Sequence, residues 1–88
     1  MIQVELYGVA RLRAGTGRVA VEGRTVGEAL RALGRACPAL AGEVLGPGGG
    51  GVHPAFRLSL NGERFVSDPA EPLAEGDALL LLSADVGG

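Results

Sequence analysis

Alternating apolar and polar residues at the start of the chain predict two paired strands. Ile2, Val4 and Leu6 alternate with polar neighbours, which is the period-two pattern of a strand with one buried face. Residues 13–17 have the composition of a turn, and residues 18–22 carry two valines, two positions apart, on one side. We therefore expect the two segments to pair as an antiparallel hairpin.

A helical period replaces the strand period after Thr25. Thr25 and Glu28 have the spacing of a capping box, in which a hydroxyl and a carboxylate satisfy free amide groups of the first turn. The helix is expected to run from Val26 to Cys37, because Pro38 disfavours helical geometry at the residue before it. Five residues at helical spacing form its apolar face: Val26, Ala29, Leu30, Leu33 and Cys37.

The second half of the chain predicts a long loop and three more strands. Residues 46–54 include four consecutive glycines and are expected to form a loop, whose role the sequence leaves open. Residues 56–60 alternate again, and the Asn-Gly pair at 61–62 is a strong hairpin signal that leads into a strand at 63–66. Residues 78–83 have leucines on both faces, which is typical of a central or covered strand.

The phase of this last strand decides which leucines are available to a partner. We expect Leu79 and Leu81 to point into the core, and Leu80 and Leu82 to point outward. A sheet with one helix buries only one of its faces, so the outward leucines would form an exposed apolar patch unless something else covers them.

Composition excludes several classes of function. With 88 residues, 47% of them hydrophobic and 20% charged, the chain is expected to form one small domain with a packed core. All 8 basic residues are arginine, and a net charge of −2 with 3% aromatic residues argues against nucleic acid as the main partner. No apolar stretch could span a membrane, and one cysteine with no signal-like N-terminus predicts a cytoplasmic protein.

Few side chains suggest chemistry. One histidine and one cysteine cannot form a structural zinc site, so we expect no metal. Cys37 is expected to pack in the core, and His53 has no catalytic partner suggested by its spacing. The glycine run lacks the lysine of a phosphate-binding loop. The remaining candidates are turn acids, which commonly cap or face water: Asp68, Glu71, Glu75 and Asp77.

The C-terminal pair Gly87 and Gly88 is left as the reactive candidate. A carboxylate becomes reactive when its oxygen is converted into a leaving group, for example in an acyl-adenylate that another enzyme forms with ATP. Glycine has no β-carbon, so a diglycine end suits insertion into a narrow active site. We therefore divide the chain into a folded domain, residues 1–83, and a flexible tail, residues 84–88.

The whole chain resembles the ubiquitin-like β-grasp sulfur carriers of the MoaD/ThiS type, and most closely the MoaD family, the small subunit of molybdopterin synthase. The segments that carry the resemblance are YGVARLRAGTG, TVGEALRALGRACPAL, LSLNGERFV and PLAEGDALLLLSADVGG. The resemblance implies an α+β fold, with a mixed sheet of four to five strands, one main helix and a flexible C-terminal tail.

The resemblance also implies a sulfur-transfer cycle. A MoeB-like enzyme would adenylate Gly88 with ATP, a sulfur donor would convert it into a thiocarboxylate, and a MoaE-like large subunit would use the sulfur to build molybdopterin. Gly87 would provide clearance, and Leu80, Leu82 and Val86 would contact the partner. The protein would bind no cofactor and would have no catalytic side chains of its own.

Three functions stay open at this point. The first is sulfur carriage for molybdenum cofactor synthesis. The second is sulfur carriage for thiamine, cysteine or tRNA thiolation, or ubiquitin-like modification of lysines. The third is a β-grasp interaction module with an incidental tail. Asp85 and the glycine-rich loop depart from the family pattern, and these departures bear on the pathway more than on the fold.

Overall fold

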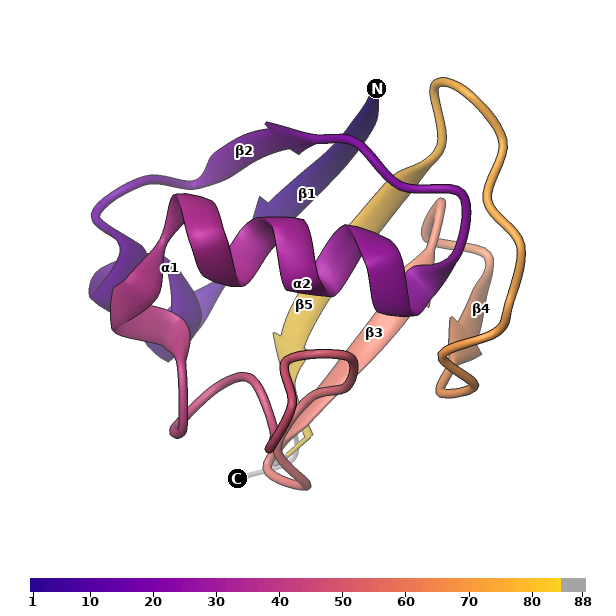
Figure 1. Ribbon diagram of the computed structural model, residues 1–88. Coiled ribbons are helices and arrows are strands. Elements are labelled where there is room, and N and C mark those ends of the chain that lie inside the picture. Colours follow the sequence, from indigo (N-terminus) through magenta and orange to yellow (C-terminus); the bar gives the residue numbers. More distant parts are fainter. Residues whose placement is uncertain (85–88) are drawn as a thin grey trace.

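The computed structural model describes residues 1–84, which form a mixed five-stranded sheet packed against one long helix (Figure 1). The elements in chain order are β1 (Ile2–Leu6), α1 (Gly8–Ala14), β2 (Arg18–Val21), α2 (Val26–Ala36), the 3-10 turn η1 (Pro38–Leu40), β3 (Phe56–Leu60), β4 (Arg64–Val66) and β5 (Ala78–Ser83). The strand order is β2-β1-β5-β3-β4, with β5 parallel to β1 and antiparallel to β3. The predicted β-grasp fold is confirmed.

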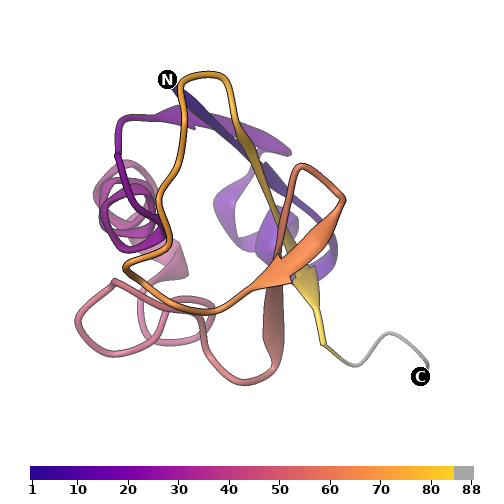
Figure 2. The ribbon, with the colours of Figure 1, turned by 90° about the vertical axis from the view of Figure 1, so that its right-hand side faces the viewer.

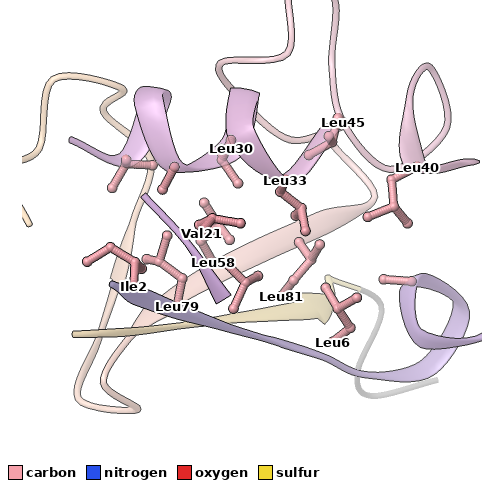
Figure 3. Packing of buried hydrophobic residues seen from close by; sticks show 14 of the residues in the cluster. Ile2, Leu6, Val21, Leu30, Leu33, Leu40, Leu45, Leu58, Leu79 and Leu81 are labelled. Atoms are coloured by element: carbon pink, nitrogen blue, oxygen red, sulfur yellow. The ribbon is translucent and has the colours of Figure 1, made fainter. Parts of the chain in front are cut away.

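The core lies between α2 and the inner face of the sheet (Figure 3). Leu79 and Leu81 of β5 are fully buried there and face Leu30 and Leu33 of α2. The predicted inward phase of the last strand is therefore confirmed. It follows from the alternation of side chains along a strand, since one face of β5 must supply the leucines that α2 covers.

Thr25 and Glu28 begin α2 as the capping-box spacing predicts, with one difference. Thr25 Oγ1 accepts a hydrogen bond from the Glu28 N–H at 3.2 Å. The Glu28 carboxylate accepts from the N–H of Arg24, at 2.9 Å, rather than from that of Thr25. The helix ends at Ala36, one residue earlier than predicted, and Cys37 is its C-cap.

The sequence patterns did not predict α1, which lies between β1 and β2. This helix has seven residues, of which only Ala10 is buried, so it shows no broad apolar stripe. It ends at Gly15, whose φ of 75° is left-handed and whose N–H donates to the Arg11 carbonyl. The flanking strands still pair antiparallel, from Ile2 opposite Val21 onward, so the expected hairpin is a strand pair connected by a helix.

A group of hydrogen bonds, which we call the latch, joins the β3–β4 turn to the start of β5. Asn61 and Gly62 have φ of 57° and 71°, as a type I′ turn requires. The Asn61 side chain donates to Asp77 Oδ1 at 3.1 Å and accepts from the Ala78 N–H at 2.8 Å. Asp77 Oδ2 accepts from the Ala74 N–H at 2.8 Å. The latch therefore holds the residue at which β5 begins.

The variant Asp77→Asn is expected to be less stable than the wild type at pH 7, with a smaller difference in acid. The hydrogen bonds from the Ala74 N–H and the Asn61 side chain hold the pKa of Asp77 below its ordinary value of 3.8. A carboxylate whose pKa is lower in the folded state than in the unfolded state stabilises the protein at pH values above its unfolded-state pKa. This contribution is lost as the pH falls through the folded-state pKa. Urea midpoints measured between pH 7 and about pH 3 test this expectation.

Glu22→Gln is the matched control for this prediction, since Glu22 is an exposed carboxylate outside the latch. Its urea midpoint should follow the wild-type pH profile. A constant difference between Asp77→Asn and the wild type across the whole pH range would contradict the assignment of this acid sensitivity to Asp77.

Candidate functional site

β5 leads the chain toward the C-terminal residues that the sequence analysis selected. It lies between β1 and β3, so both of its edges are paired. Around its end, the Tyr7 N–H donates to the Leu81 carbonyl at 3.2 Å, and the Ala84 N–H donates to the Ala55 carbonyl at 2.7 Å. The base of the C-terminal segment is therefore held by the middle of the sheet.

Three of the predicted site residues, Val86, Gly87 and Gly88, lie outside the described residues. Their roles therefore stay predictions, as does the flexibility of the tail. Ala84, which the sequence analysis assigned to the tail, is described and continues the antiparallel pairing of β5 with the residue before β3.

The other two predicted contact residues, Leu80 and Leu82, lie on the outer face of the sheet, away from α2. Both are half-buried. Ser59 and Arg57 of β3 are their cross-strand partners, and Glu5 of β1 lies opposite Leu80 on the other side. Ser59 is buried, and the other residues form with Phe65 of β4 a surface that we call the outer patch: Glu5, Arg57, Phe65, Leu80 and Leu82.

Phe65 and Arg57 give the outer patch an aromatic and basic end. The Phe65 side chain is 59% exposed, and the Arg57 guanidinium carbon lies 5.2 Å from the centroid of its ring. This distance is within the range of a cation–π interaction. Aromatic residues and arginine are enriched in protein interfaces, so the outer patch has the composition of a docking surface.

α1 adds exposed apolar residues beside the end of β5. Leu12 is 82% exposed and Val9 is 49% exposed. The neighbouring Tyr7 hydroxyl donates to the Glu5 carboxylate at 2.7 Å, and this hydrogen bond raises the pKa of Tyr7. Sequence reasoning missed these residues. Their signal is weak, because two apolar residues three positions apart are too few to establish a helical period.

The side chains considered for other chemistry have local structural roles. His53 Nδ1 accepts a hydrogen bond from the Ala55 N–H at 3.1 Å, and Cys37 is half-buried against the core. Within residues 1–84, no group of histidine, cysteine and acidic residues is arranged to hold a metal ion. In the same part of the chain, no helix is long and apolar enough to cross a membrane.

The four turn acids are engaged in local contacts too. Asp68 and Asp77 each accept a backbone N–H from a residue two or three positions away, at 2.9 Å and 2.8 Å. Glu71 pairs with Arg64 at 2.6 Å, and Glu75 pairs with the N-terminal amine. These acids hold turns and chain ends in place, and no pair of them faces an enclosed cleft.

Comparison with known proteins identifies the class of this chain. No family model and no curated protein matches it. Small archaeal modifier protein 1 of Haloferax volcanii is 33% identical, covering 99% of this chain and 98% of that chain, with a TM-score of 0.78. Another solved structure of the Haloferax volcanii protein is 36% identical, covering 91% and 92%, with a TM-score of 0.72.

A chain of the BexX/CysO complex of Amycolatopsis orientalis has the same fold. It covers 100% of both chains with a TM-score of 0.81, and at 20% identity this likeness concerns the fold alone. The likeness to the Haloferax volcanii protein is closer in sequence and spans almost the full length of both chains. On this basis, the chain belongs to the ubiquitin-like sulfur carriers of the MoaD/ThiS-like class.

Proposed function

We propose that this protein carries sulfur as a thiocarboxylate on its C-terminal residue, Gly88. The observation that carries the proposal is the 33% identity to a ubiquitin-like protein over 99% of this chain. Gly87 and Gly88 of this sequence are the candidates for the chemistry. The position of β5 supports it, because a strand paired on both edges is a firm base from which to present the C-terminal segment. The outer patch then serves as the docking surface for the enzymes that act on Gly88.

The proposed chemistry changes only the terminal carboxyl group. An oxygen of the Gly88 carboxylate attacks the α-phosphorus of ATP, and pyrophosphate leaves. Hydrosulfide, or a donor that delivers it, then attacks the acyl carbon, and AMP leaves with the original oxygen. The sulfur later passes to the acceptor, and water restores the carboxylate. Glycine at both terminal positions leaves the acyl carbon open to each attack.

Within this class we place the protein in molybdopterin synthesis, as the small subunit of the synthase. A MoeB-like enzyme activates Gly88, and a MoaE-like large subunit accepts the tail. The resemblance of the helix, hairpin and C-terminal segments to the MoaD family supports this choice. The outer patch indicates the partner's chemistry: apolar side chains against the two leucines and Phe65, and a carboxylate opposite Arg57.

A second candidate function is attachment of Gly88 to lysines of other proteins. The name of the similar Haloferax volcanii protein, a small archaeal modifier, favours it. This chain contains no lysine. A modifier of this sequence would therefore be attached singly, because one copy offers no lysine side chain to the next.

Intact-mass spectrometry tests the carrier proposal. The protein is incubated with ATP, hydrosulfide and a MoeB-like enzyme whose competence is first established on another carrier. The expected result is the exchange of one oxygen for one sulfur, located at Gly88 by fragmentation. No exchange under these conditions would overturn the proposal.

Two further measurements separate the candidates. Sulfur transfer to a pterin precursor in the presence of a MoaE-like subunit would favour molybdopterin synthesis over the other carrier pathways. Recovery from lysate of lysine side chains linked to Gly88 would favour the modifier. Absence of such linkages in a lysate where the protein is abundant would count against it.

A further inference from the structure

The sheet has a notch at its β4 edge, because β4 is shorter than β3. β4 pairs only with the stretch of β3 from Leu58 to Leu60, whereas β3 begins at Phe56. Phe56 and Arg57 therefore have a strand neighbour on the β5 side and none on the β4 side. Figure 2 shows the molecule from this side, with β4 toward the viewer and α2 at the left.

The hydrogen-bond pattern directs one backbone acceptor into the notch. The Ala84 N–H donates to the Ala55 carbonyl, and alternate residues of an antiparallel strand face the same neighbour, so Arg57 also faces β5. Phe56 therefore faces the opposite side. Its N–H donates to the His53 carbonyl at 2.9 Å. Its carbonyl points toward the space that β4 leaves uncovered.

An apolar pocket of about 380 Å³ opens at the notch. This volume is within the range of roughly 300 to 1,000 Å³ for clefts that bind ligands. α2 contributes the buried residues Val26 and Leu30, and the glycine-rich loop contributes Gly51 and Val52. Val52 and Phe56 pack on the core but stay half-buried. Apolar surface therefore remains open at this point.

Arg57 makes the rim of the pocket positive. It lines the pocket at the border with the outer patch. Its guanidinium lies over Phe65, and within residues 1–84 no carboxylate forms an ion pair with it. A ligand with a carboxylate beside an apolar group therefore complements this rim better than a neutral or basic ligand does.

We propose that the notch binds an extended, acidic peptide segment of a partner protein. One large apolar side chain of the segment enters the pocket against Val26, Leu30 and Val52, and an adjacent carboxylate meets Arg57. A peptide N–H donates to the Phe56 carbonyl, so the segment pairs with the part of β3 that β4 does not reach. The site needs neither Gly88 nor sulfur chemistry, so its test is independent of the test of the proposed function.

An NMR titration of the full chain tests this site with the peptide acetyl-Asp-Val-Leu-Val-Asp-amide as the probe. Saturable shifts of the amide signals of Gly51, Val52, Phe56 and Arg57 are expected. Binding should weaken with added salt, because charge contributes to it. Replacing both aspartates by lysine, or the central leucine by serine, should weaken it as well. No shifts at millimolar peptide, or shifts confined to the leucines of the outer patch, would overturn the proposal.

Gly51→Leu and Gly46→Leu are a matched pair of variants in one loop. A Cβ at Gly51 would have no neighbouring atom within 4 Å, and its side chain would project at the mouth of the pocket. Gly46 does not line this pocket, and the nearest atom to a Cβ there is the Val52 carbonyl oxygen at 3.6 Å. We expect Gly51→Leu to weaken peptide binding by about tenfold or more. Gly46→Leu should bind as the wild type does.

Thermal unfolding first establishes that both variants keep the wild-type fold. Equal peptide affinities of the two variants would then overturn the assignment to this pocket. Shifts at the notch that depend on protein concentration in the absence of peptide would identify a second copy of the chain as the occupant, and would also overturn the proposal.

Discussion

Appending one alanine after Gly88 is expected to abolish thiocarboxylate formation while leaving the fold unchanged. The added residue moves the terminal carboxyl group by about 3.5 Å along an extended chain. A misplacement of about 1 Å at a reacting centre can already reduce a rate about 100-fold. The alanine also brings a β-carbon to a position where glycine allows the closest approach. Intact mass after incubation with ATP, hydrosulfide and the activating enzyme measures the effect.

Insertion of one alanine between Pro47 and Gly48 is the control for this extension. It adds the same residue in a surface loop, far from the C-terminus in sequence, where insertions are tolerated. This variant should be thiocarboxylated as the wild type is. If the C-terminal extension keeps both partner binding and biological activity, the tail is incidental, and the third function, a β-grasp interaction module, is favoured instead.

Leu81→Ala is expected to destabilise the fold much more than Leu82→Ala does, although the two residues are adjacent. Leu81 is completely buried under α2, and its truncation should lower the free energy of unfolding by about 2–5 kcal/mol. That is a large part of the roughly 5–15 kcal/mol that stabilises a typical domain. Leu82 is half-buried on the outer patch, so Leu82→Ala should cost clearly less stability. Urea denaturation of the two variants measures the difference.

Leu82 is expected to matter for partner binding rather than for stability. We expect Leu82→Ala to weaken binding to a MoeB-like or MoaE-like partner by about tenfold, which corresponds to about 1.4 kcal/mol. Calorimetric titration of the folded variant measures this. Unchanged affinity would show that the outer patch is not the docking surface, and an equal loss of stability in the two variants would contradict the phase of β5.

The strand and helix predictions succeeded where a local pattern carries the information. The alternation in β1 and β3 and the helical spacing in α2 depend on residues a few positions apart. The same is true of the hydroxyl of Thr25, which caps its own helix. The phase of β5 was predictable for a related reason: one of its two leucine pairs had to face the helix.

The features that were missed depend on contacts between distant parts of the chain. α1 is too short to show a period, and it packs against η1 and β5, which lie much later in the chain. The latch joins Asn61 to Asp77, which lie 16 positions apart, and each looks like an ordinary turn residue by itself. The notch arises because β4 pairs with only part of β3.

The resemblance of the whole chain to a known family implied the fold class. By itself, the sequence determined the positions of the strands and of the main helix, the inward and outward faces of the last strand, and the C-terminal diglycine as the candidate for chemistry. These follow from periodicity, capping and the absence of a β-carbon, all of which are local properties. Only the tertiary structure decided that Arg57 and Phe65 extend the leucine patch, and that the glycine-rich loop borders an apolar pocket beside an unpaired stretch of β3. Strand order and strand length create these surfaces, and no single segment of the chain contains either one.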